Sequence, residues 1–268
     1  MIDMVFDKSY FNQLLVPIWL FGFCVILHAV SGYGFEGDWL SLDGGYVWLE
    51  LMTFFCALSM VLRPQWVMPT VVVSFLCIFK YLLPLDYNSN SVFLIFSISL
   101  VFLSGYLIAF VSHCVGRLAV TDICERAAEF ILPGLRALLV VMYFYGIFHK
   151  INAGWFDIDN GCAVRWWEDI YSPYLRSFLD YTAFRWFVIW APLLLELLFM
   201  VGLFTRGGMK YLSMVGGVFF HLFIGFSSFR LYWAFSVAVL ILYSAFLPPD
   251  FLHRCALFFS KKRKWMFF

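Results

Sequence analysis

Lys150 is the residue of this sequence whose type and position best suit a general base. It follows the hydrophobic segment Ile131–Phe148, where we expect a membrane span to meet the outer interface. Burial disfavours the charged form of an amine and so lowers its pKa. A desolvated lysine can therefore be neutral near neutral pH and accept a proton from a substrate as a general base. The alternative is a structural lysine that extends its ammonium group toward water while its methylene groups stay in the apolar region.

Glu196 and His221 lie within other hydrophobic segments. Glu196 comes four residues after Pro192, and His221 follows Gly216 and Gly217, glycines that favour close helix packing. An ionisable group costs roughly 2.5–3.5 kcal/mol in a bilayer, so these side chains are not expected to face lipid. We expect a Glu196–His221 hydrogen bond, which would be either a polar link between helices or a proton-handling pair in a cavity.

Two neighbours of Lys150 bear on its role. Arg136, Tyr143 and Lys150 recur every seven residues, so they share one helical face, which we expect to point into a helix bundle. His149 points about 100° away from Lys150 around the helix. It is therefore either a packed interfacial histidine or an indirect partner of the lysine. Lys80 and Arg136 lie near predicted span ends, where long cationic side chains extend toward head groups.

The composition indicates which environment surrounds these groups. The chain has 268 residues, of which 63% are hydrophobic and only 13% charged, whereas soluble domains carry roughly 25% charged residues. Membrane residence follows, with lipids as partners. The net charge is +1, which argues against nucleic acid as a partner, because phosphate binding needs clustered cations.

The hydrophobic pattern predicts an all-α polytopic membrane bundle of about eight spans. It forms one domain over residues 1–268, with no appended soluble domain. The predicted spans are Phe11–Val30, Gly45–Leu62, Val67–Leu83, Ser91–Val111, Ile131–Phe148, Phe187–Phe204, Tyr211–Phe226 and Leu231–Leu247. With both termini in the cytoplasm, eleven cations fall on the inner side and five on the outer side, as the positive-inside rule requires.

The connection from His149 to Trp186 is rich in tryptophan and tyrosine, which favour the membrane–water interface. We expect two short interfacial helices here, broken near Pro173, which could cover an outward-facing cavity. No metal site is predicted. His113, Cys114 and Cys124 share one predicted inner loop, but the seven cysteines show no C-x-x-C spacing.

The segment Tyr143–Trp155, YFYGIFHKINAGW, resembles a signature of the vitamin K-dependent gamma-carboxylase family. More broadly it resembles the HTTM group, the horizontally transferred transmembrane domain. Leu193–Glu196 resembles the family's acidic position in a hydrophobic helix, and Phe219–His221 its aromatic–histidine element. Asp86–Asn90 resembles its short polar loop, and Pro248–Asp250 the proline turn after its last span. The order and spacing match over nearly the whole chain.

This resemblance implies a quinol-dependent activity. In the carboxylases the matching lysine is regarded as the base that deprotonates vitamin K hydroquinone, after which an oxygenated product removes a proton from glutamate and carbon dioxide adds. The implied cofactor is a vitamin K-type or other quinol. The implied catalytic set consists of Lys150, His149, Glu196 and His221. The residues implied for cofactor binding are Tyr143, Trp155 and Asn90.

Asn90 marks a departure from the family. The carboxylases carry a histidine in this loop, and an amide forms hydrogen bonds but does not exchange protons near neutral pH. They also carry a large soluble C-terminal region. We therefore expect a smaller apolar ligand or a partner subunit in place of a protein substrate. The alternative is a membrane scaffold or lipid-binding subunit that keeps the fold without the carboxylase- or lyase-type activity. A transporter is less favoured, because no internal symmetry is evident.

Overall fold

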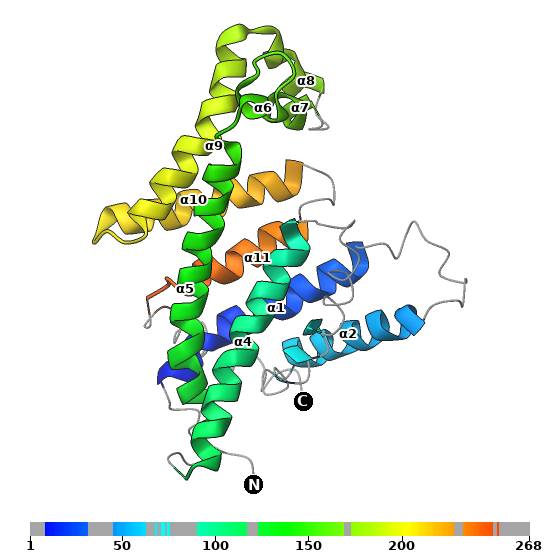
Figure 1. The fold of residues 1–268 in the computed structure, drawn as a ribbon, viewed down its shortest axis with the longest axis vertical. Helices are drawn as coiled ribbons and strands as arrows, with labels where there is room; N and C mark the ends of the chain where they lie inside the picture. The colour runs from blue at the N-terminus through cyan, green and yellow to red at the C-terminus, as the bar shows by residue number, and fades with distance from the viewer. Residues whose placement is uncertain are drawn as a thin grey trace, which may run out of the picture. The chain divides into compact units, whose positions relative to one another are not determined.

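The computed structural model describes residues 9–31, 45–62, 68, 71–72, 74–75, 90–116, 123–168, 173–227, 233–248 and 251 (Figure 1). Within these residues all regular secondary structure is helical, which confirms the all-α prediction. The helices are α1 (Ser9–Ser31), α2 (Gly45–Leu62), α4 (Asn90–Cys114), α5 (Ile123–Lys150), α6 (Ala153–Phe156), α7 (Cys162–Glu168), α8 (Pro173–Arg176), the 3₁₀ helix η3 (Ser177–Asp180), α9 (Thr182–Gly202), α10 (Gly208–Ser227) and α11 (Trp233–Ser244).

Four helices of the described ranges, α4, α5, α9 and α10, are long and apolar enough to cross a membrane. Large apolar side chains are exposed along them, among them Leu107, Phe144, Leu194 and Phe219. Such a surface is unfavourable in water and matches the hydrocarbon core of a bilayer. Inside a bilayer a helix also satisfies its own backbone hydrogen bonds. Length, composition and surface together indicate a multi-pass membrane protein.

The chain divides into two compact units. One consists of Met1–Leu138 with Val237–Phe268, and the other of Leu139–Ser236. The boundaries between them fall within α5 and α11. We refer to Met1–Leu138 with Val237–Phe268 as the first unit and to Leu139–Ser236 as the second unit.

Small residues let the helices of the first unit approach closely. A Cβ on Gly22 of α1 would lie 2.7 Å from Val61 of α2, and one on Gly105 of α4 would lie 2.5 Å from Ile131 of α5. Phe21 of α1 stacks on Phe102 of α4, with ring centroids 5.4 Å apart. These contacts place the core of the unit between α1, α2, α4 and the first part of α5.

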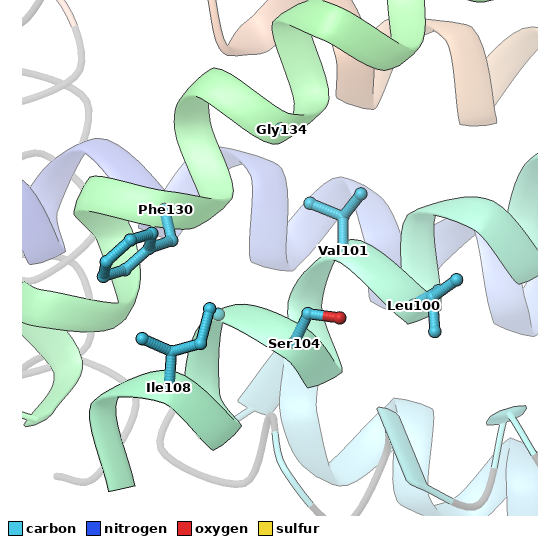
Figure 2. Close-up of a pocket in the computed structure, with 7 residues that line it drawn as sticks. Leu100, Val101, Ser104, Ile108, Phe130 and Gly134 are labelled. Carbon is cyan, nitrogen blue, oxygen red and sulfur yellow. The ribbon is translucent and has the colours of Figure 1, made fainter. Parts of the chain in front are cut away.

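An open apolar groove of about 320 Å³ runs between α4 and α5. Figure 2 shows Leu100, Ser104 and Ile108 on α4 and Phe130 on α5 around it. Gly105 and Gly134, which have no side chains, also line the groove, between larger apolar residues. Its lining is chemically suited to hydrocarbon chains.

In the second unit, α9 packs against α10. The ring of Phe199 lies over Gly216, where a Cβ would be 2.8 Å from the ring. This contact confirms the prediction that Gly216 permits close packing.

Four short helices, α6, α7, α8 and η3, lie beside the first turns of α9 (Figure 1). Their core consists of Ala163, Val164, Leu179, Val188 and Ile189, with tryptophan and phenylalanine side chains around it. The sequence predicted two helices broken near Pro173. The structure has more, and Pro173 begins α8, as expected of a residue with a fixed φ and no N–H group.

The turn between α6 and α7 is held by Asp157. Its Oδ1 accepts hydrogen bonds from the backbone N–H groups of Asn160, at 3.1 Å, and Asp159, at 2.9 Å. Gly161 donates its N–H to the Asp157 carbonyl at 2.8 Å. The Asn160 and Asp159 bonds hold the pKa of Asp157 below its ordinary value, because they favour the ionised carboxylate.

This turn is expected to loosen in acid. A carboxyl group whose folded pKa is depressed stabilises the fold above its unfolded pKa, and the contribution is lost as the pH falls through the folded pKa. Hydrogen exchange at the amides of Asp159 and Asn160 should therefore show lower protection below about pH 4 than near neutrality. Asp157→Asn should remove most of this pH dependence, with Asp180→Asn as the control. Unchanged pH dependence in Asp157→Asn would contradict the assignment.

The structure extends some predicted elements. The fifth predicted span begins at Ile131, whereas α5 begins at Ile123. The added turns contain Glu125, Arg126 and Glu129, which are good helix formers that a hydropathy criterion leaves out. His113 and Cys114 end α4 and Cys124 lies in the first turn of α5, so these residues do not share a loop. Most of the predicted span 67–83, and the segments 249–250 and 252–268, lie outside the described residues.

Candidate functional site

Lys150 and Glu196 form an ion pair in the second unit. The Lys150 Nζ lies 2.7 Å from both Oε1 and Oε2 of Glu196. The side chains are 18% and 10% exposed, respectively. Because the pair is largely withdrawn from solvent, its interaction is much stronger than that of a surface ion pair. The structure therefore brings together two of the four residues predicted to be catalytic.

The backbone at Gly146 makes room for this pair. A Cβ on Gly146 would lie 3.3 Å from Oε2 of Glu196 and 3.6 Å from Nζ of Lys150. The Gly146 carbonyl also accepts a hydrogen bond from Nζ at 3.2 Å. An ammonium group has three donors, and two carboxylate oxygens and one carbonyl occupy them here.

Trp155 connects the amine to α9. The Lys150 Nζ lies 5.5 Å from the centre of the Trp155 ring, within the range of a cation–π interaction. The indole Nε1 donates to the carbonyl of Ile189 at 3.0 Å, three residues before Pro192. Asn152 caps α6 by accepting the backbone N–H of Trp155 at 3.0 Å. The cap fixes the backbone at Trp155, and the bond to Ile189 holds its indole ring.

Tyr143 and His221 form the second polar contact of this unit. The Tyr143 Oη and His221 Nε2 are 3.0 Å apart, and both residues are 1% exposed. The rings of Phe220 and Phe235 pack on the imidazole, with centroids 5.3 and 5.8 Å away. The predicted Glu196–His221 hydrogen bond is thus wrong. Glu196 accepts from Lys150, and His221 bonds to Tyr143.

This contact is expected to be a modest helix-to-helix link. Tyr143→Phe should lower the free energy of unfolding by about 1 kcal/mol, since interhelical hydrogen bonds in membranes average about 0.6 kcal/mol and a buried nitrogen loses its partner. Tyr145→Phe is the matched control, because Tyr145 is on the same helix and 67% exposed. Equal unfolding of the two variants in a mixed-micelle titration would argue against the bond.

The remaining predicted residues lie elsewhere. His149 is exposed, so it does not join the buried cluster. Arg136 belongs to the first unit, where its Nε donates to the carbonyl of Ala245 at 2.8 Å. Asn90 is the first residue of α4, and its side chain lies outside the described residues. Gly146 and Asn152 were not predicted to belong to the site. A glycine one helical turn before a lysine is too common a pattern to have identified Gly146.

The pair offers proton chemistry more readily than metal chemistry. In the described parts of the chain no three His, Cys, Asp or Glu side chains gather as metal ligands. An amine and a carboxylate in direct contact favour each other's charged state. Passing one proton from Nζ to the carboxylate converts the pair into a neutral amine and a neutral acid.

Comparison with other proteins adds no relative. No family model, no curated protein and no solved structure matches this chain.

Proposed function

We propose that this chain is an HTTM-type integral membrane protein of eight spans, with both termini in the cytoplasm. In this proposal Lys150 and Glu196 handle the proton of an apolar weak acid such as a quinol. Four long apolar helices support the membrane part of the proposal. The likeness of Tyr143–Trp155 to the lysine segment of that family supports the HTTM assignment and the role of Lys150.

The observation that carries the proposal is the buried Lys150–Glu196 ion pair, with both carboxylate oxygens 2.7 Å from Nζ. A lone lysine at this position would need only to extend toward water. A carboxylate brought to it from another helix gives the amine a proton acceptor at hydrogen-bond distance. In surroundings of low dielectric constant the two charges carry a desolvation cost that a neutral amine and a neutral acid avoid.

The chemistry within the pair is a proton relay. Transfer of one proton from Nζ to an Oε atom of Glu196 leaves an unprotonated amine beside a carboxylic acid. The amine nitrogen then has a lone pair with which to take a proton from a hydroxyl group presented to it, which restores the ammonium. The proton held by Glu196 is available to a later acceptor. General bases of this kind typically contribute 10²–10⁴-fold to a rate.

Of the residues assigned to quinol binding, Trp155 fits best. Its ring lies beside the amine, so an aromatic ring stacked there would present a hydroxyl group near Nζ. A quinol would supply an acidic hydroxyl group and, on oxidation, two electrons. Tyr143 fits less well, because its hydroxyl group is buried against His221.

A non-catalytic membrane scaffold is the second candidate. It is favoured by the complete occupation of the amine by Oε1, Oε2 and the Gly146 carbonyl. A fully satisfied polar group between two helices also serves as a structural link. Ligand binding, if present, would then survive the loss of Lys150.

Substitution of Lys150 separates the two candidates. Lys150→Ala and Glu196→Gln should abolish the oxidation of an added quinol by the purified protein in air-equilibrated nanodiscs, where dissolved oxygen accepts the two electrons. Lys210→Ala, a lysine of α10, should retain it. Quinol binding, followed by quenching of tryptophan fluorescence, should weaken in Trp155→Leu. Equal turnover by the wild type and Lys150→Ala would end the catalytic proposal and leave the scaffold.

A further inference from the structure

Arg136 is a charged residue that the proposed function does not use. It lies near the middle of α5, roughly 20 Å from either end at 1.5 Å per residue. The 28 residues of α5 extend about 42 Å, which exceeds the hydrocarbon core of about 30 Å. With the Lys150 end at one boundary of the core, Arg136 lies about 9 Å inside the other. It is thus below the head groups of the opposite leaflet.

The guanidinium group is held in place by the end of α11. Its Nε donates to the carbonyl of Ala245 at 2.8 Å, directly after the last residue of that helix. Such carbonyls lack a partner within the helix and are available to a side chain. The guanidinium carbon lies 5.7 Å from the centre of the Phe246 ring. All three residues belong to the first unit, so the contact is internal to it.

The Nη groups of the guanidinium take no part in the hydrogen bond to Ala245. The Arg136 side chain is exposed, and in the described parts of the chain only its Nε has a hydrogen-bond acceptor. On the same helix, Glu129 is paired with Arg126. A fixed cation with free Nη groups within reach of the head groups is unfavourable unless an anion meets it. The edge formed by two Nη atoms matches the two oxygens of a phosphate.

We propose that Arg136 binds the phosphate group of a membrane phospholipid, with Nε fixed on Ala245 and the Nη edge directed to the lipid. The proposal concerns only the first unit and is independent of the base chemistry. A free phosphate ion has the same chemistry but does not enter a hydrocarbon region readily. A phospholipid, in contrast, already holds its phosphate at the edge of this region, toward which an arginine side chain extends from within the core.

Lipid binding by the full chain tests this site. In a maltoside detergent, dioleoylphosphatidylcholine should raise the melting temperature of the wild type and remain bound in native mass spectrometry. Dioleoylglycerol, which has the same chains without phosphate, should do neither. Arg136→Gln should weaken phosphatidylcholine binding about tenfold or more, as loss of a charge-assisted hydrogen bond implies. Arg126→Gln, the matched control on α5, should stay within about twofold of the wild type.

Three results would overturn the proposal. Equal stabilisation of the wild type by dioleoylglycerol would show that the phosphate is not recognised, and this comparison needs no variant to fold. Equal phosphatidylcholine binding by Arg136→Gln would remove the arginine from the site. Stabilisation by millimolar inorganic phosphate alone, lost in Arg136→Gln, would assign the site to a free anion.

Discussion

Replacing Glu196 by leucine is expected to lower the free energy of unfolding by about 3 kcal/mol, the lower end of the range for breaking a buried ion pair. The lower end applies because the two side chains keep 18% and 10% exposure. The loss arises from the Lys150 ammonium, which stays in a largely buried position without its counter-charge. Equilibrium unfolding in mixed micelles, titrated with a denaturing detergent, measures the change.

A double variant distinguishes the contribution of the ion pair from the cost of leaving one of its charges unpaired. Lys150→Met combined with Glu196→Leu should recover most of the lost stability, because replacing both charges by apolar groups removes the desolvation cost of each. Proton-handling activity, in contrast, should be absent from the single and the double variants alike. A double variant less stable than Glu196→Leu would show that the pair stabilises the fold beyond its desolvation cost.

The surface ion pair Arg126–Glu129 is the matched control. It lies on α5, with side chains 44% and 38% exposed. Exposed pairs contribute about 0–1 kcal/mol, since water screens them. Glu129→Leu should therefore change the free energy of unfolding by less than about 1 kcal/mol. A loss as large as that of Glu196→Leu would show that the assay reports leucine substitution on a helix and not the ion pair.

Gly202→Ala is expected to lower the free energy of unfolding by about 2 kcal/mol or more, as overpacking of a tight contact does. A Cβ on Gly202 would lie 1.8 Å from Oγ and 2.9 Å from Cβ of Ser213. Rotation of the serine relieves the first clash but not the second. Helices α9 and α10 must therefore move apart, which disturbs the contact of Phe199 with Gly216 as well. Thermal unfolding in detergent measures the effect.

Removal of the opposing side chain should restore the contact. Ser213→Gly in the Gly202→Ala background removes both clashing atoms, so the double variant should unfold closer to the wild type than Gly202→Ala does. Gly208→Ala is the control, since nothing lies within 4 Å of its Cβ position. It should be neutral or slightly stabilising, by up to about 1 kcal/mol of helix propensity. Wild-type stability of Gly202→Ala would mean that α9 and α10 do not pack through this glycine.

The amino-acid sequence alone is enough to predict the helical class and the four helices, α4, α5, α9 and α10, that are long and apolar enough to cross a membrane. Hydropathy over about 20 residues is a local property, so α2 begins and ends where its apolar segment does. α5 departs from this rule because its first two turns are charged yet helix-forming. The sequence also singled out Lys150, Glu196 and His221, because the cost of an ionisable group in apolar surroundings does not depend on the fold.

Which of these groups meet depends on how the helices pack. Sequential helices made Glu196 and His221 the natural partners, yet Glu196 contacts Lys150 and His221 contacts Tyr143. A helix that is apolar on every side gives little sign of its rotation, and that rotation fixes where a single polar side chain points. Close contacts at Gly146 and Gly202 set the rotation, because a missing Cβ matters only when another helix approaches it.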